Sequence, residues 1–199
     1  MHLGYGQLQQ LMMDMNGIPS SRATAVSSRI RYMNRMDFPR GLRVGKGGRS
    51  TYDVEQALAM AVAFELLQCE MSPLRTVRTV RGGWDAARQA FIHAWRLVGA
   101  TGVPAQRTLL ATVQYALDDL AEAAPPSPED AIADGLFLLD AAGLEEWAVG
   151  KPPGRRRLLL LDPVRIIETL HGSLPADLRG EGFSNAMEAF CRSVPKRSV

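Results

Sequence analysis

The sequence is poor in cysteine: its 199 residues contain only two, Cys69 and Cys191. Neither has another cysteine or a histidine nearby at the spacing of a metal site, so the pattern predicts no disulfide framework and no zinc site. Isolated cysteines are typical of a reducing compartment, where a buried thiol acts as a small apolar residue. We therefore expect a cytoplasmic protein without a bound metal.

Long apolar runs are also absent. No stretch approaches the roughly 20 apolar residues that a membrane helix needs. The first ten residues lack the charged and apolar regions of a secretory signal. These absences predict that the protein neither spans a membrane nor is secreted.

Catalytic motifs are missing too. The three histidines are dispersed, and neither a Gly-x-Ser-x-Gly nor a His-Glu-x-x-His sequence occurs. The acidic pairs Asp118–Asp119 and Glu145–Glu146 are adjacent in sequence, so their side chains diverge on a helix or a strand. The sequence predicts neither an enzyme nor a cofactor site.

Charge is distributed unevenly, although the net charge is only +2. Residues 1–83 contain 11 Lys+Arg and 6 Asp+Glu, whereas residues 84–199 contain 12 and 15. This asymmetry predicts two domains, a basic binding domain over 1–83 and a helical assembly or partner-binding domain over 84–199.

The basic charge is concentrated between residues 20 and 50, where a single acid, Asp37, occurs. The eight basic residues are Arg22, Arg29, Arg31, Arg35, Arg40, Arg43, Lys46 and Arg49. Charge of one sign on a helix and an adjoining turn is what contact with the phosphates of DNA requires. A solvated helix surface is the alternative, but such surfaces usually mix the two signs.

Apolar spacing predicts two short helices in this part of the chain. The first covers residues 6–15, and the second begins at Ser20 or Ser21 and buries Val26, Ile30 and Met33. Together they read as a helix-turn-helix. The outward side of the second helix carries Arg22, Ser28, Arg29, Arg31, Tyr32 and Arg35.

A glycine-rich turn follows. Leu42 to Val44 and Ser50 to Tyr52 predict a hairpin, or wing, with Lys46 and Arg49 at its tip and Arg43 on its first strand. A nucleotide-binding loop and an ordinary surface hairpin are alternatives, although the P-loop spacing is lacking. Tyr52, like Tyr32 on the helix, can either reach the phosphate backbone or pack between helix and wing.

Two further helices complete the N-terminal part. Asp53 is a suitable N-cap for a helix to about Cys69, and Ser72-Pro73 starts another that ends near Arg81. The run RIRYMN, then a proline, then GKGGRSTYDVEQALAMAVAFELLQCEMSPLRTVRTV resembles the winged helix-turn-helix of MerR-type regulators over about 75 residues. It is also similar to excisionases and to small terminase subunits of tailed phages.

The second part gives weaker signals. An apolar stripe from Trp84 to Val98 predicts a helix, and it forms either core or an interface. We further expect helices over 104–123, from Ser127 onward, from Asp162-Pro163 to about Gly172, and near the C-terminus, with a hairpin turning at 151–154. The triplet Arg155 to Arg157 lies beside this turn, where solubility alone accounts for it; contact with DNA or RNA is the alternative.

These expectations combine into one hypothesis. The fold is mainly α, with an N-terminal winged helix-turn-helix and a C-terminal helical domain that contains one β-hairpin. The resemblance implies a bacterial, nucleoid-associated transcriptional regulator that binds double-stranded DNA as a homodimer or with a protein partner; a phage-type architectural, excisionase or small-terminase-like protein is the alternative. The expected DNA-binding residues are Arg22, Ser28, Arg29, Arg31, Tyr32, Arg35, Arg43, Lys46, Arg49 and Tyr52.

Overall fold

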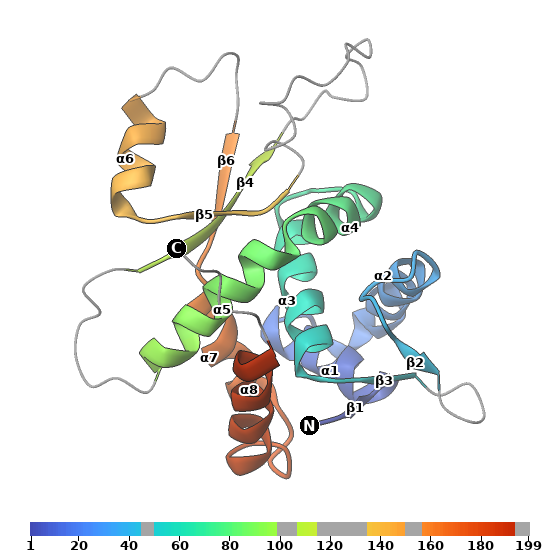
Figure 1. Ribbon diagram of the computed structural model, residues 1–199. Coiled ribbons are helices and arrows are strands. Elements are labelled where there is room, and N and C mark those ends of the chain that lie inside the picture. Colours follow the sequence, from blue (N-terminus) through green and yellow to red (C-terminus); the bar gives the residue numbers. More distant parts are fainter. Residues whose placement is uncertain (45–49, 99–106, 115–134, 150–156, 194–199) are drawn as a thin grey trace. The chain divides into compact units, whose positions relative to one another are not determined.

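The computed structural model describes residues 1–44, 50–98, 107–114, 135–149 and 157–193 (Figure 1). This part of the chain is mainly helical and contains two small antiparallel sheets. Its contacts divide it into two compact units. Unit 1 comprises Met1–Val77 with Arg165–Val199, and unit 2 comprises Arg78–Val164.

Unit 1 is built around one apolar helix. The helices are α1 (Tyr5–Met15), the 3-10 turn η1 (Ser20–Arg22), α2 (Ala23–Arg35), α3 (Val54–Gln68) and α8 (Glu181–Ser193), with most of α7 (Pro163–Ser173). Helix α3 is apolar on nearly all sides, as befits a helix that other elements surround. It contacts α1 and α8. The sequence predicts a boundary between residues 83 and 84, but α8 is grouped with the N-terminal residues because it packs against α3.

The start of α3 is fixed by side chains. The Asp53 carboxylate accepts a hydrogen bond from the Gln56 backbone N–H at 2.9 Å, and Gln56 Oε1 accepts one from the Asp53 N–H at 3.0 Å. Gln56 Nε2 also donates to the Arg40 carbonyl at 3.0 Å. This capping box satisfies the otherwise free amides of the first turn and ties the preceding loop to α3.

The first sheet has the strand order β1-β3-β2 and lies next to these helices (Figure 1). Strand β2 (Arg43–Val44) pairs antiparallel with β3 (Ser50–Tyr52), as the hairpin pattern predicts. Strand β1 (Leu3–Gly4) pairs with the other edge of β3, with Leu3 opposite Tyr52. Two residues are too few for a periodic pattern, so no local pattern predicts β1.

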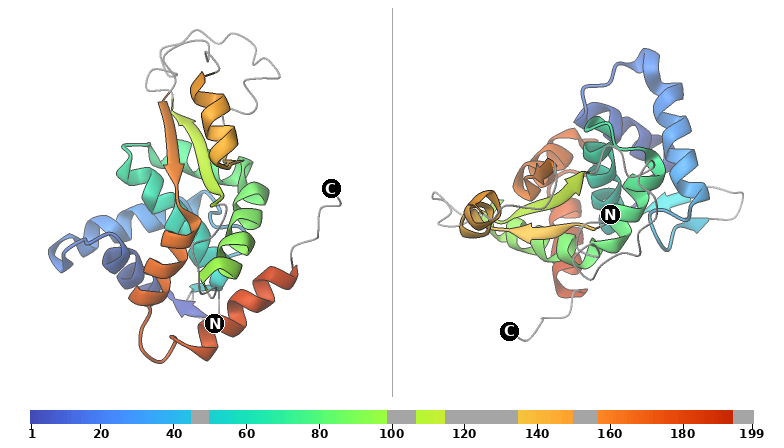
Figure 2. Two further views of the ribbon diagram at one scale, coloured as in Figure 1. Left: turned by 90° about the vertical axis from the view of Figure 1, so that its left-hand side faces the viewer. Right: turned by 90° about the horizontal axis from the view of Figure 1, so that it is seen from above.

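Unit 2 contains a sheet where mainly helices were expected. Strand β4 (Leu109–Gln114) lies between β5 (Phe137–Leu139) and β6 (Arg157–Leu161), and both pairings are antiparallel (Figure 2). Helix α5 (Trp84–Val98) packs on β4 and β5, and α6 (Ala141–Val149) contacts β5. Helix α4 (Pro73–Gly82) spans the boundary between the units.

Three predictions for this region are therefore wrong. The expected helix over 104–123 is strand β4 in its described portion. The backbone of this strand pairs with two other strands, and its apolar side chains Leu110, Ala111 and Val113 are buried. The expected hairpin before Asp162 is instead helix α6 followed by β6, which pairs with β4 and not with its own neighbour in sequence. The helix expected from Ser127 onward, with Leu136 and Leu139 on its inner side, is strand β5 over its described end, because Phe137–Leu139 pairs with β4. The start at Ser127 and the turn at 151–154 lie outside the described residues.

The remaining helix predictions are confirmed. Helix α5 runs from Trp84 to Val98, α7 from Pro163 to Ser173 and α8 from Glu181 to Ser193. The Asp162 carboxylate accepts a hydrogen bond from the Val164 N–H at 3.0 Å, as expected for the cap of α7.

Candidate nucleic-acid interface

Helix α2 presents two different sides. Val26, Ile30 and Met33 are at most 2% exposed and face the core of unit 1. The side opposite to them carries exposed Ser28, Arg31, Tyr32 and Arg35. These four residues follow one another at spacings of three, one and three, which places them on one helical stripe. We call this stripe the basic face.

The basic face is partly organised by contacts within it. The Arg35 guanidinium carbon lies 5.6 Å from the centre of the Tyr32 ring, within the range of a cation–π contact. Ser28, Arg31, Asn34 and Arg35 line a shallow hollow of about 400 Å³. A hollow with two guanidinium groups and a hydroxyl offers hydrogen-bond donors to an anion such as a phosphate.

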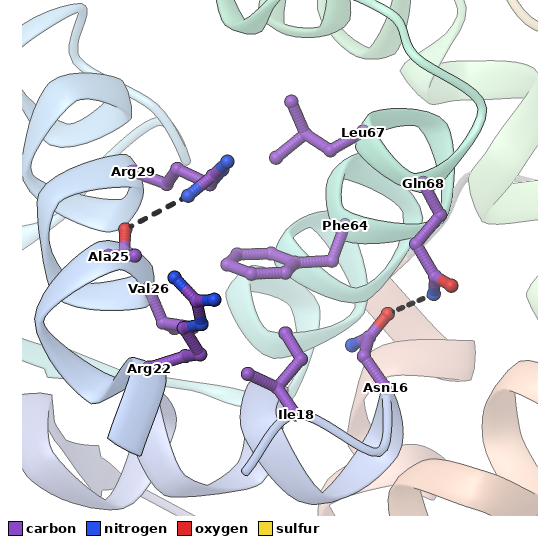
Figure 3. A pocket seen from close by; sticks show the side chains of 9 residues that line it. All are labelled: Asn16, Ile18, Arg22, Ala25, Val26, Arg29, Phe64, Leu67 and Gln68. Carbon is purple, nitrogen blue, oxygen red and sulfur yellow. Dashed lines mark hydrogen bonds between the residues drawn. The ribbon is translucent and has the colours of Figure 1, made fainter. Parts of the chain in front are cut away.

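Arg22 and Arg29 lie at the margin of α2 and not at the centre of the exposed side. Both line a second hollow between α2, the turn after α1 and the end of α3 (Figure 3). Arg29 Nη1 donates to the Ala25 carbonyl at 3.3 Å. The sequence pattern places all these arginines together on the outward side of the second helix. In the structure Arg31 and Arg35 lie at the centre of that side, and Arg22 and Arg29 lie at its edge.

The positive charge on and beside α2 has no carboxylate partner within the described residues. No carboxylate among the described residues forms an ion pair with Arg22, Arg29, Arg31 or Arg35. All four side chains are exposed. Surface arginines commonly pair with carboxylates on solvated helix faces, so a cluster without such partners leaves a local positive potential available to an external anion.

Helix α2 is held rigidly against α1. The Tyr5 hydroxyl is 2.8 Å from Ser27 Oγ and donates to the Ser27 carbonyl at 3.0 Å. Gln9 Nε2 donates to the Ala23 carbonyl at 3.1 Å. These bonds connect the two helices through Ala23 and Ser27 and use no residue of the basic face.

Tyr52 differs from the predicted DNA-binding residues on α2, which are exposed. Its side chain is fully buried, and its hydroxyl accepts a hydrogen bond from Asn34 Nδ2 at 2.8 Å. From this position the hydroxyl cannot reach DNA, so of the two alternatives Tyr52 takes the one in which it packs between helix and hairpin. Asn34, which the sequence pattern did not single out, links α2 to β3 through this bond.

The environment of Tyr52 also changes its titration. Burial raises the pKa of the Tyr52 phenol above its ordinary value of 10.0, because the phenolate would lose its hydration; the hydrogen bond from Asn34 acts in the opposite direction. Below pH 10 the phenol is protonated in both the folded and unfolded chain. Above pH 10 the unfolded chain releases this proton first, so folding stability falls as the pH rises.

We expect Tyr52→Phe to destabilise the protein by about 1–2 kcal/mol at neutral pH, because Asn34 Nδ2 loses its acceptor. Asn34 Oδ1 is already buried without a partner, so the amide has no second anchor. The variant should also lose part of the decline in stability above pH 10. Urea unfolding followed by circular dichroism measures both effects.

Tyr32→Phe is the matched control, because Tyr32 is 40% exposed and its hydroxyl makes no hydrogen bond among the described residues. It should leave the free energy of unfolding unchanged. Equal losses in the two variants, or an identical decline above pH 10 in Tyr52→Phe and wild type, would contradict the role assigned to the buried hydroxyl.

The hairpin is described only in part. Arg43 lies on β2 opposite Thr51 of β3. Lys46 and Arg49, the expected tip residues, lie outside the described residues. The strands that carry the tip are thus present, and the contact role of all three basic residues stays a prediction.

The other sequence signals fall elsewhere. On α5, Ala87 and Phe91 are fully buried, and Phe91 lies 6.3 Å from the Trp84 ring, so this part of the stripe is core of unit 2. Arg157 begins β6, whereas Arg155 and Arg156 lie outside the described residues.

Neither a metal cluster nor a membrane helix is found in the described part of the chain. No group of three or more His, Cys, Asp or Glu gathers there. No described helix combines the length and apolar character needed to cross a bilayer. Neither cysteine is part of a disulfide, and both are half-buried.

Comparison with protein-family models, curated proteins and solved structures finds no match to this chain. A functional assignment has to come from the geometry and charge of the site itself.

Proposed function

We propose that the chain is a sequence-specific DNA-binding regulator of transcription and that α2 is its recognition helix. The observation that carries this proposal is the basic face: exposed arginines on one side of a helix whose other side is fixed in the core, with no carboxylate partner in the described residues. Helix, hairpin and capped α3 follow in the order of a winged helix-turn-helix, which supports the same proposal.

The dimensions and chemistry suit duplex DNA. The major groove of B-DNA is about 12 Å wide and admits an α-helix. Arginine can donate two parallel hydrogen bonds to guanine O6 and N7, which gives Arg31 and Arg35 a means of reading sequence. Arg22, Arg29 and the basic residues of the hairpin would contact phosphates, which position the helix.

One small module gives a limited interface. Specific binding at physiological salt usually needs a larger contact than one helix and one hairpin supply. We therefore propose that the protein binds DNA as a homodimer or with a protein partner, and that residues 84–199 provide this contact. Two copies would read two half-sites about one helical turn apart.

Selection from a randomised duplex pool tests the proposal. The intact chain should enrich a defined sequence that contains guanine, because arginine side chains face the groove. A pool that stays random although DNA is retained would contradict sequence-specific regulation and indicate an architectural role. No retention of duplex at low salt would overturn the proposal.

A further inference from the structure

The hollow beside α2 differs from the basic face in one respect: it has an apolar floor. Its volume is about 370 Å³, and it lies between α2, the turn after α1 and the last turns of α3. Its lining residues are Asn16, Ile18, Arg22, Ala25, Val26, Arg29, Phe64, Leu67 and Gln68 (Figure 3). All of them belong to unit 1.

Two guanidinium groups are directed into this hollow. Arg22, at the end of η1, and Arg29 of α2 extend toward the Phe64 ring and Leu67 of α3 (Figure 3). Their positions are seven residues apart, two turns on the same side of the helix. No acidic residue is part of the lining. Like charges at one site repel each other, and a bound anion would relieve this repulsion.

The rest of the hollow divides into an apolar floor and a fixed amide edge. Val26 and Phe64 are 2% and 3% exposed and form the floor, with half-buried Ile18 and Leu67 beside them. Asn16 Nδ2 donates to the Met12 carbonyl at 2.7 Å, and Gln68 Nε2 donates to Asn16 Oδ1. These bonds hold the amides in place, so the edge opposite the arginines is preformed.

We propose that this hollow binds a small amphipathic anion, with a compact apolar or aromatic body and one carboxylate, sulfonate or phosphate group. The apolar body would lie on Phe64, Val26 and Leu67, and the anionic group would accept hydrogen bonds from Arg22 and Arg29. A mostly apolar concave site with a few convergent donors is the usual form of a small-molecule site. Charge-assisted hydrogen bonds supply its selectivity for anions.

Binding of such an anion would oppose DNA binding. This consequence rests on the proposed function, in which Arg22 and Arg29 contact phosphates. A ligand that occupies both guanidinium groups removes them from the DNA contact, so each ligand lowers the affinity for the other. The hollow would thus act as an effector site that competes with the operator.

Calorimetric titration of the intact protein with 1-naphthoate, and with neutral 1-naphthamide of nearly the same shape, tests the site. We expect naphthoate to bind at 1:1 with a dissociation constant of about 1 mM or tighter, and naphthamide to bind at least about 10-fold more weakly. Arg22→Ala/Arg29→Ala should weaken naphthoate about 10- to 100-fold. Arg31→Ala/Arg35→Ala, which lies outside the hollow, should leave naphthoate binding unchanged.

Leu67→Gln provides a second variant that removes apolar contact while it keeps both arginines, and it should weaken naphthoate and naphthamide alike. Circular dichroism melting shows that each variant is folded. Equal affinity for the two probes, or full affinity in the Arg22→Ala/Arg29→Ala variant, would overturn the site. If naphthoate binds but DNA does not, the anion site is supported and the proposed function is contradicted. If DNA binds but naphthoate does not, the proposed function is supported and the anion site is contradicted.

Discussion

Arg31→Glu/Arg35→Glu is expected to lower affinity for duplex DNA about 100-fold or more. Two charge-assisted hydrogen bonds are lost, and two carboxylates then face the phosphates. Both side chains are exposed and have no carboxylate partner in the described structure, so the reversal removes no internal ion pair. Fluorescence anisotropy with a labelled duplex at low salt measures the loss.

Arg192→Glu is the control for a change of net charge alone. Arg192 is an exposed arginine in the last turn of α8, within the same compact unit as α2. Its reversal should change DNA affinity only slightly. If Arg192→Glu weakens binding as much as a single reversal on α2, the attraction is a property of total charge and the assignment of α2 fails.

Gly83→Ala is expected to destabilise unit 2 strongly. A Cβ at this position would lie 2.1 Å from the Leu136 backbone N and 2.5 Å from its Cα. Backbone atoms cannot rotate away as a side chain does, so the structure must shift. Overpacking of this kind costs about 1–3 kcal/mol, and we expect the upper end. Gly83 also joins α4 to α5, since its N–H donates to Thr79 and its carbonyl accepts from Ala87.

Tryptophan fluorescence follows this effect directly, because all three tryptophans, Trp84, Trp95 and Trp147, lie in unit 2. Gly172→Ala in α7 is the matched control: nothing lies within 4 Å of its added Cβ, and a helical glycine is replaced by a better helix former. It should be neutral or slightly stabilising. Equal urea midpoints for the two variants would contradict the close approach of Gly83 and Leu136.

The N-terminal elements could be predicted from sequence because their signals are local. Apolar spacing and caps gave α1, α2, α3 and α4 to within a few residues, and Asp53 caps α3 through a side-chain bond as expected. The glycine-rich turn marked the hairpin, whose strands pair as predicted. In each case the residues that decide the structure lie within one turn or one hairpin of each other.

The sheet of unit 2 could not be found in the same way. Strand β4 pairs with β6 from Leu110 opposite Leu161 to Gln114 opposite Arg157, across more than 40 residues of sequence. Short apolar runs such as Leu109 to Val113 fit either a strand or a buried helix. Only partners distant in sequence decide between the two, and no local pattern shows them.

The sequence identifies which residues of α2 are exposed, but it does not predict how their side chains are arranged. The arginines of α2 are exposed as the spacing indicates, yet their rotation on the core places Arg31 and Arg35 at the centre and Arg29 at the edge. The inward turn of Tyr52 and its bond from Asn34 depend on how β3 packs on α2. The apolar floor under Arg22 and Arg29 combines Val26 of α2 with Phe64 of α3, and no local sequence pattern shows that these two residues meet.

The salt dependence of DNA binding by the intact chain tests the central claim most directly. If Arg22, Arg29 and the basic residues of the hairpin neutralise phosphates, the logarithm of the association constant should fall linearly with the logarithm of the salt concentration, with a slope of roughly −4 to −5. The slope should become less steep by about 2 in Arg22→Ala/Arg29→Ala, which removes two of the phosphate contacts. Binding that is insensitive to salt, or a slope that the double variant leaves unchanged, would contradict the account of α2 as the DNA-binding helix.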